Sequence, residues 1–362
     1  MHASPDPIEA VSQRLGRFVE VQRQQWASGG PETGLFLDAA ARTLAGGKRL
    51  RARFCVTGWR AVAEGEDAVA ELPLEVLDAA AALEVFHAAA LVHDDIIDNS
   101  DTRRGQPAAH RALESAHVAS HWLGEPAAFG RSAAVLLGDL LVAWSDDLLE
   151  QGLRSATHAA SAREVYALMR REVTIGQFLD IAEEAAFATA PDDEHAERAL
   201  RVASLKSARY SIQHPLLLGA ALAGADAEQS AALAAFGHPL GLAFQLRDDV
   251  LGVFGDSAVT GKPSGDDLRE GKRTLLIAYA REGLDVSGRR KLDALIGDPG
   301  LDAGQIAALQ QTIVDTGALD RVEADISRYA ADADAALSGA RLAARAVDAL
   351  RTLADASITR TA

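Results

Sequence analysis

The stretch LEVLDAAAALEVFHAAALVHDDIID, residues 74–98, decides the fold class. It contains neither glycine nor proline, and alanine and leucine, two strong helix formers, dominate it. It therefore predicts one long helix that is apolar for most of its length and ends in aspartates. Apolar residues recur at helical spacing in residues 8–27 as well, where Ile8, Val11 and Leu15 lie on one stripe.

The same periodicity continues through most of the chain. Further helices are predicted at 131–151, 159–184, 226–253 and 318–352. Short polar or glycine-containing segments separate them, so consecutive helices are expected to be antiparallel neighbours. The sequence shows no alternating strand pattern with hairpin turns. We predict a single all-α domain over residues 1–362, built as a bundle of long antiparallel helices.

Composition excludes several classes of protein. The chain has 362 residues, 36 Lys+Arg against 52 Asp+Glu, and a net charge of −16, which disfavours a nucleic-acid partner. One cysteine rules out a disulfide within the chain, and a hydrophobic content of 48% argues against disorder. No uncharged apolar run of about 18 residues and no apolar signal core stand out. We expect a cytoplasmic protein without an integral membrane segment.

The end of the 74–98 helix carries the first chemical motif. Asp94, Asp95 and Asp98 stand at positions i, i+1 and i+4, so two of them share a face and the third flanks it. Three like charges repel one another there, at the negative end of the helix dipole. Stability alone does not explain this placement, whereas carboxylate oxygens suit Mg²⁺ together with substrate phosphates. A solvated helix end is the alternative for one such motif.

A second acidic pair follows in LAFQLRDDVLGVFGD, residues 242–256. Asp248 and Asp249 again end an apolar helical stretch, with Gly252 and Asp256 one and two turns further on. Two such ends together indicate a diphosphate site with several metal ions.

Basic residues beside glycine turns complete the pattern. The segment GGKRLRAR, residues 46–53, places several cations at a predicted helix start, where backbone N–H groups also favour phosphate. Lys206 is expected to end an amphipathic helix. The other cations of this kind are Lys48, Arg51, Arg103, Arg104, Lys262 and Lys272. Any one of them alone could be an ordinary surface charge.

Taken together, the chain resembles the trans-isoprenyl diphosphate synthase (polyprenyl synthetase) family. Five motifs occur in the family's order: GGKRLR, LEVFHAAALVHDDIIDNSDTRRG, LKS, FQLRDD and the GK…GDDLREGKRT loop. The resemblance implies helices around a deep central cavity and a homodimer. It also implies Mg²⁺-dependent head-to-tail condensation of isopentenyl diphosphate with a dimethylallyl, geranyl or farnesyl diphosphate.

The resemblance further implies roles for matching residues. Up to three Mg²⁺ ions would be bound by Asp94, Asp95, Asp98, Asp248 and Asp249. Those same aspartates are the implied catalytic residues, together with Arg103, Lys206 and Gln245. The implied substrate-binding residues are Lys48, Arg51, His87, Arg103, Arg104, Lys206, Ser207, Gln245, Lys262 and Lys272. Lys272 would also help the 255–272 loop to close and exclude water.

The second acidic motif departs from the family pattern. The family usually has an aspartate four residues after the first, where this chain has Gly252. We expect activity to survive, because Asp248, Asp249 and Gln245 remain. Asp256 is one candidate substitute.

Product length is expected to depend on residues preceding Asp94 on its helix. Ala89 and Ala90 stand where family members with fifteen-carbon products commonly carry an aromatic residue, and Phe86 could form a deeper floor. We therefore predict geranylgeranyl diphosphate, with longer chains as the alternative. Two rivals remain: a terpene cyclase, whose second metal motif does not occur here, and a non-catalytic subunit, which typically loses more aspartates.

Overall fold

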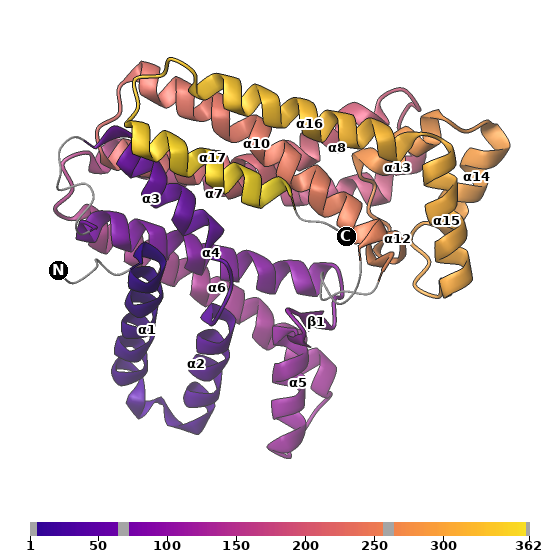
Figure 1. Ribbon diagram of the computed structural model, residues 1–362. Coiled ribbons are helices and arrows are strands. Elements are labelled where there is room, and N and C mark those ends of the chain that lie inside the picture. Colours follow the sequence, from indigo (N-terminus) through magenta and orange to yellow (C-terminus); the bar gives the residue numbers. More distant parts are fainter. Residues whose placement is uncertain (1–5, 64–71, 256–263, 360–362) are drawn as a thin grey trace. The chain divides into compact units, whose positions relative to one another are not determined.

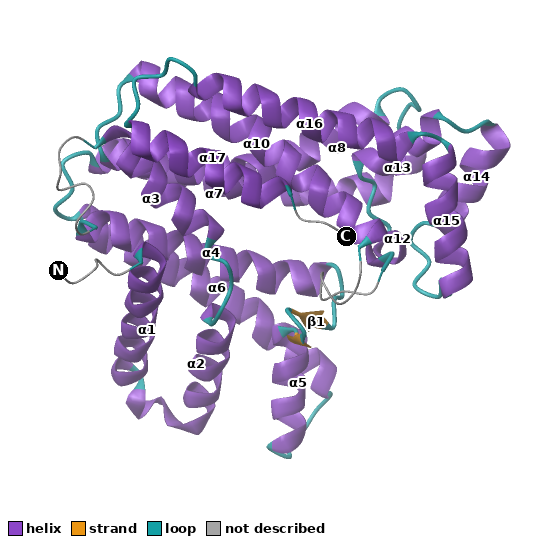
Figure 2. Ribbon diagram, viewed as in Figure 1, coloured by secondary structure: helices purple, strands orange, loops and turns teal. Residues whose placement is uncertain are grey.

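The computed structural model describes residues 6–63, 72–255 and 264–359, and nearly all regular structure in them is helical (Figures 1 and 2). In chain order the first helices are α1 (Pro7–Gln25), η1 (Ala27–Gly29), α2 (Gly30–Leu44), α3 (Leu50–Val62), α4 (Leu74–Ile97), α5 (Ala109–Ala119), α6 (Pro126–Leu153) and α7 (Ala159–Ala186). They are followed by η3 (Phe187–Thr189), α8 (His195–Val202), η4 (Ala203–Gln213), α9 (His214–Leu222), α10 (Ala227–Phe254) and α12 (Asp266–Glu270). The last are α13 (Leu275–Glu282), α14 (Val286–Leu295), α15 (Ala303–Asp315), α16 (Ala318–Leu337) and α17 (Ala344–Ile358). The all-α prediction is confirmed.

The helix boundaries follow the sequence pattern closely, with one exception. The long helices predicted from the 74–98 and 226–253 patterns appear as α4 and α10. The single helix predicted at 318–352 is wrong. Gly339 has a φ of 75°, in the left-handed region, and it separates α16 from α17.

One short β-hairpin interrupts the helices. Strands β1 (Thr102–Arg103) and β2 (Gln106–Pro107) pair antiparallel, directly after the first acidic motif. Arg104 and Gly105 form the two-residue turn between them, and both have positive φ, 54° and 71°, as a type I′ turn requires. Strands this short were not foreseen from the sequence.

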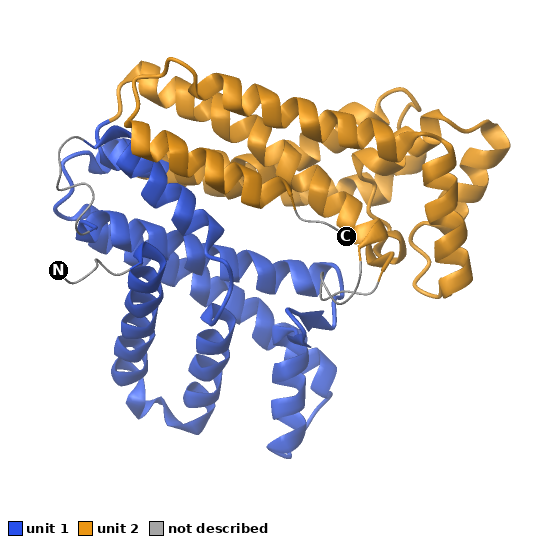
Figure 3. Ribbon diagram, viewed as in Figure 1, with its two compact units in different colours: residues 1–161, 218–224 blue, residues 162–217, 225–362 orange. Residues whose placement is uncertain are grey.

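Contacts divide the chain into two units, shown in separate colours in Figure 3. Unit 1 comprises residues 1–161 and 218–224, and in it α4 packs against α6, α3 and α1, while α6 also packs against α5. Unit 2 comprises residues 162–217 and 225–362, and in it α10 packs against η4 and α16. The single-domain organisation stays a prediction.

Each unit has its own apolar interior. In unit 1 the buried face of α4 is largely alanine, so neighbouring helices approach closely. At Gly138 of α6 a Cβ would come within 2.1 Å of the His93 ring of α4. In unit 2 a large cluster of buried side chains joins α10 to the C-terminal helices; it includes Leu246, Val250, Val253, Leu276, Ile277, Ile313, Val322 and Ile326.

Two helices, α4 and α6, are long and apolar enough to cross a membrane, judged by length and composition alone. The most apolar window of α4 is 78% buried inside the protein, which is typical of a core helix. The corresponding window of α6 is 33% buried. The apolar character of α4 is thus explained by its place in the interior of unit 1, whereas α6 leaves apolar side chains exposed.

Candidate active site

The first acidic motif lies on the accessible face of α4. His87, Ala90, Asp94 and Asp98 recur at a spacing of three or four residues, and each is partly exposed. Asp95, which lies beside Asp94 but off that face, is only 2% exposed. The motif therefore combines open carboxylates with one that is held inside unit 1.

Arg103 of the β-hairpin neutralises part of this motif. Its Nε donates a hydrogen bond of 2.8 Å to Asp95, its Nη2 donates a second, and the same Nη2 lies 3.8 Å from Asp94. Burial raises the pKa of Asp95, and the hydrogen bond and charge of Arg103 oppose that rise. The cation expected to hold the allylic diphosphate thus rests on the acidic motif in this structure.

A second group of cations gathers around the glycine loop that precedes α3. Gly47 has a φ of 88°, which favours glycine, and a Cβ there would crowd the Arg104 guanidinium at 3.0 Å. Arg104 also donates a hydrogen bond of 3.3 Å to the Ala45 carbonyl. The loop and the hairpin turn are thereby brought together within unit 1.

His87 lies among these cations. Burial and the charges of four arginines, Arg49, Arg51, Arg103 and Arg104, hold the pKa of His87 well below its ordinary value. Burial also lowers the pKa of Arg104, and its cationic neighbours lower it further. Such a concentration of positive charge suits an anion of two phosphates, and a neutral imidazole can still donate one hydrogen bond to it.

Arg49 and Lys48 of the glycine loop differ in their surroundings. Arg49, which was not among the predicted site residues, is buried, donates a hydrogen bond of 2.5 Å to the Leu44 carbonyl, and lies 3.6 Å from Glu84. Glu84 in turn accepts a hydrogen bond of 3.0 Å from the Ala52 amide at the start of α3. Arg49 therefore stabilises the loop, while the Lys48 side chain is exposed.

A hollow of about 400 Å³ lies behind the same loop in unit 1, between α1 and α2. Its lining is mainly apolar, with Leu15, Val19 and Leu44 among its residues. None of the aspartates of the first motif lines it. We assign it no part in the site.

In unit 2 the second acidic motif ends α10. Asp248 is partly exposed, whereas Asp249 is 7% exposed and accepts a hydrogen bond of 2.6 Å from the Gln245 amide. Burial raises the pKa of Asp249 well above its ordinary value, and the negative charge of Asp267 raises it further, while the Gln245 hydrogen bond opposes both. Gln245 thus orients a carboxylate instead of pointing freely into solvent.

Lys206 and Ser207 lie inside a π-helix, η4, and not at the end of an amphipathic helix as predicted. Two glycines allow the neighbouring helices to approach it. A Cβ at Gly176 of α7 would lie 2.4 Å from the Lys206 amide nitrogen, and one at Gly241 of α10 would lie 2.4 Å from the Ala208 carbonyl oxygen. π-Helical segments often occur at functional sites, and here the segment fixes the position of a predicted substrate-binding lysine.

Asp180 of α7 is a residue that the sequence reasoning missed. Its carboxylate lies 2.5 Å from the Lys206 Nζ and 3.6 Å from the Lys272 Nζ, so it brings two predicted diphosphate-binding lysines together. Lys272 also lies 3.6 Å from Glu184. Gly176 and Asp180 stand one turn apart on α7, but the close approach of Gly176 to Lys206 is visible only in the structure.

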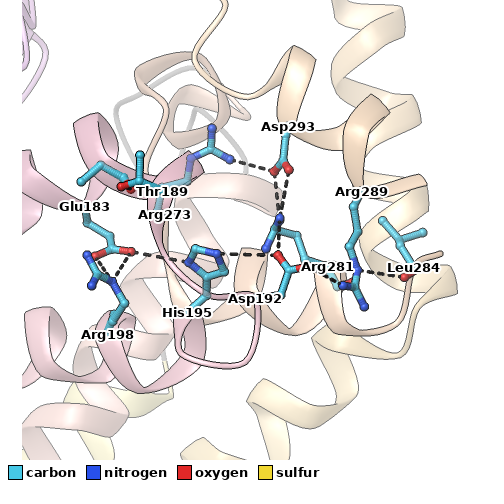
Figure 4. A network of polar contacts seen from close by, with 11 residues as sticks. Glu183, Thr189, Asp192, His195, Arg198, Arg273, Arg281, Leu284, Arg289 and Asp293 are labelled. Carbon is cyan, nitrogen blue, oxygen red and sulfur yellow. Dashed lines mark hydrogen bonds and ion pairs between the residues drawn. The ribbon is translucent and has the colours of Figure 1, made fainter. Parts of the chain in front are cut away.

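A network of charged and aromatic side chains stabilises the chain next to Lys272 (Figure 4). The guanidinium of Arg273 lies 4.0 Å from the centre of the Phe187 ring and 3.3 Å from Asp293. Arg281 lies against the same ring and donates hydrogen bonds to the same carboxylate. His195 stacks on Phe187 with ring centres 4.1 Å apart. The residue after Lys272 is therefore held firmly within unit 2.

The structure describes some of the predicted site residues and not others. Lys262 and Asp256 lie outside the described residues. Phe86 is buried, Ala89 is fully buried, and Ala90 is partly exposed on the Asp94 face of α4. Of the two alanines, Ala90 is therefore the one that shares the accessible face of α4 with Asp94.

The chemistry of the donors fits Mg²⁺ bound together with a diphosphate. Among the described residues, no three His, Cys, Asp or Glu side chains form a group that could hold a metal ion alone. Mg²⁺ typically takes one or two carboxylates, keeps several waters and binds substrate phosphates. Open aspartate motifs are consistent with such binding, since phosphate oxygens and water complete the coordination.

Comparisons with known proteins identify the family. A family model described as Polyprenyl synthetase matches residues 35–313. A geranylfarnesyl diphosphate synthase of Aeropyrum pernix is 34% identical over 289 residues, which are 79% of this chain and 81% of that protein. A geranylgeranyl diphosphate synthase of Methanosarcina mazei is 31% identical over 282 residues, 77% and 75% of the two chains.

A solved structure extends the similarity to the whole chain. The crystal structure of geranylgeranyl pyrophosphate synthase from Corynebacterium glutamicum, complexed with isoprenyl diphosphate and magnesium, has a TM-score of 0.89 and 39% identity, and the match covers 100% of both chains. These matches define the class of protein as an all-α trans-prenyltransferase. The chain belongs to the polyprenyl synthetase family. Family membership also supports a divalent metal as cofactor.

The environment of His87 generates a prediction about pH. Its pKa is lowered in the folded state, so the unfolded chain takes up a proton near pH 6.5 that the folded chain does not, and stability is lost as the pH falls. When the pH falls from 6.5 to 5.5, the free energy of unfolding should drop in both proteins, but by about 1 kcal/mol less in His87→Gln than in the wild type. Urea unfolding at both pH values measures the difference.

Four other histidines, His110, His195, His214 and His238, also have a lowered pKa and remain in the variant, so both proteins should become less stable on acidification. Equal losses in the two proteins would show that His87 titrates in the folded protein as it does in the unfolded chain, and a smaller loss in the wild type would show that it is already protonated when folded.

Proposed function

We propose that this trans-prenyltransferase condenses isopentenyl diphosphate with an allylic diphosphate and releases mainly geranylgeranyl diphosphate. The proposal depends most on one observation: the accessible face of α4 carries Asp94 and Asp98 with the small Ala90 preceding them. An alanine leaves room for a long prenyl chain beside the diphosphate. Relatives named as geranylgeranyl and geranylfarnesyl diphosphate synthases support the same range of products.

The residues of unit 1 divide between the two substrates in this proposal. Asp94, Asp95 and Asp98 bind metal with the allylic diphosphate, and Arg103 exchanges its carboxylate partners for that diphosphate. The cations Lys48, Arg51 and Arg104, with neutral His87, bind isopentenyl diphosphate. This division follows the two groups of charges in the structure, one on the acidic motif and one around the glycine loop.

The residues of unit 2 stabilise the leaving group in this proposal. Asp248 and Asp249 bind a third ion, Gln245 orients Asp249, and Lys206, Lys262 and Lys272 bind diphosphate oxygens. When bound, the divalent ions offset negative charge that builds on the departing diphosphate. The allylic C–O bond breaks, the double bond of isopentenyl diphosphate attacks the allylic cation, and the released diphosphate accepts the proton that leaves. Ser207, beside Lys206 in η4, lies near that cation in the same proposal.

The activity is tested directly. Purified protein with Mg²⁺, labelled isopentenyl diphosphate and either dimethylallyl, geranyl or farnesyl diphosphate should incorporate label into a twenty-carbon product, sized after dephosphorylation. Chelation of Mg²⁺ should abolish incorporation, because the carboxylates then have no cation to offset them. A twenty-five-carbon product would favour the geranylfarnesyl type, and absence of incorporation with every starter would exclude the synthase.

Chain length is tested at Ala90. Ala90→Phe adds an aromatic ring on the Asp94 face of α4 and should shift the main product toward farnesyl diphosphate, because the ring blocks the growing chain. Ala89→Phe serves as the comparison: its side chain is fully buried, so it should lower stability more than it changes product length. An unchanged product distribution in Ala90→Phe contradicts the assignment.

We further propose a soluble, cytoplasmic homodimer formed through unit 1. Val118, Leu123, Val135 and Leu136, on α5, α6 and the segment between them, expose 56%, 97%, 43% and 61% of their surface. Exposed apolar side chains on these elements favour association of two copies, which would also cover the poorly buried α6.

Light scattering in detergent-free buffer should give twice the chain mass of 38.1 kDa. Leu136→Glu should shift the protein toward the monomer, because it places a charge in the apolar interface. Leu74→Glu, at a residue that is 70% exposed at the start of α4, is the matched control and should leave the dimer intact. A monomeric wild type, or a protein that sediments without detergent, would contradict the proposal.

A further inference from the structure

Gly252 stands where the second acidic motif lacks its last aspartate, and the side chain of another residue fills the space beside it. Gly252 stands one turn after Asp248 on the same face of α10, where the family usually has an aspartate. A Cβ built on Gly252 would lie 1.9 Å from Oδ2 and 2.3 Å from Cγ of Asp267. No side chain fits at position 252 while Asp267 keeps its place, so the Asp267 carboxylate occupies that space.

The backbone of α12 holds Asp267 at this position. Gly265, with a φ of 73°, begins the short helix, and Gly271, with a φ of 84°, ends it. The Asp267 carbonyl accepts a hydrogen bond of 3.0 Å from the Lys272 amide, and the next side chain, Leu268, is 1% exposed in the apolar interior of unit 2. The carboxylate is therefore presented by a structured turn that packs against α10.

The carboxylate of Asp267 lies beside the second motif. It lies against Gly252, which stands one helical turn after Asp248 and Asp249 on α10. Like charges so close together disfavour the folded protein unless a cation offsets them. A divalent ion bound by Asp248 and Asp249 would therefore also be stabilised by the negative charge of the Asp267 carboxylate.

We propose that Asp267 is the third carboxylate of the second metal motif, presented from α12 into the space that Gly252 leaves on α10. This inference rests on the proposed function, since it concerns the metal that the reaction requires. It replaces Asp256 as the substitute for the missing aspartate. It also makes metal binding depend on α12, which Lys272 follows, so the ion and a diphosphate-binding lysine are positioned by one turn.

The test moves the carboxylate between the two positions in the full-length protein. Binding of Mn²⁺ in the presence of inorganic diphosphate is followed by the electron paramagnetic resonance signal of free Mn²⁺. Asp267→Asn should weaken this binding on the order of tenfold, as is typical when a supporting ligand is lost. Gly252→Asp alone should also weaken it, because the new side chain displaces Asp267. The exchange of both, Gly252→Asp with Asp267→Gly, should restore binding.

Two matched controls separate this inference from general charge or folding effects. Asp266→Asn removes the adjacent carboxylate of α12. It should leave Mn²⁺ binding within about twofold of the wild type, because solvent and salt screen the charge of Asp266. Gly252→Ala adds no charge, yet its Cβ should displace Asp267 and weaken binding. Gly16 is a helical glycine of α1 where an added Cβ would meet no neighbouring group within 4 Å, so Gly16→Ala should bind Mn²⁺ as the wild type does.

Each outcome has a stated meaning. Wild-type affinity in Asp267→Asn, or an equal loss in Asp266→Asn, overturns the inference. Tighter binding in Gly252→Asp alone also overturns it, because the space would then be available. Thermal unfolding of each variant without metal shows whether it is folded, and Gly252→Ala decides the matter if the double exchange does not fold. Because Mn²⁺ binding needs no turnover, a wild type that binds Mn²⁺ but incorporates no isopentenyl diphosphate would refute the proposed function alone.

Discussion

Repulsion between carboxylates is the constraint on which the candidate active site depends. Each acidic motif places aspartates near the C-terminal end of an apolar helix, and in the last turn of α4 the helix dipole is also unfavourable. In unit 1 Arg103 offsets this cost at Asp95, whereas in unit 2 Lys206 and Lys272 pair with Asp180, a carboxylate whose negative charge acts on Asp249. Cations proposed to bind anionic substrates thus stabilise carboxylates of the protein itself.

Close approach of backbones determines where those cations stand. Gly47 admits the Arg104 guanidinium, and Gly176 and Gly241 let two helices close on the π-helix that carries Lys206. A methyl group at Gly47 would crowd the Arg104 guanidinium, and at Gly176 or Gly241 it would collide with backbone atoms that cannot rotate away. Positions without side chains are therefore as much a part of the candidate active site as the charged residues.

The sequence sufficed for the long helices and for the two acidic motifs, but not for the helix break at Gly339 or for the hairpin. Helical periodicity located α4 and α10, and the spacing of aspartates within each helix identified the two motifs. It could not reveal Asp180 or Asp267 as members of the site, because their neighbours are far away in the chain: Lys206 lies 26 residues from Asp180, and Gly252 precedes Asp267 by 15 residues. The π-helix around Lys206 was missed for a related reason, since its hydrogen bonding depends on packing and not on composition.

The type I′ turn of the hairpin has a consequence for how the two substrates affect each other. Arg103 and Arg104 are consecutive residues, yet the first contacts the acidic motif and the second contacts the glycine loop. A movement of this short turn would displace both guanidinium groups together. Two anions, one on each arginine, would then share a single covalent segment, and any coupling between them would be reciprocal.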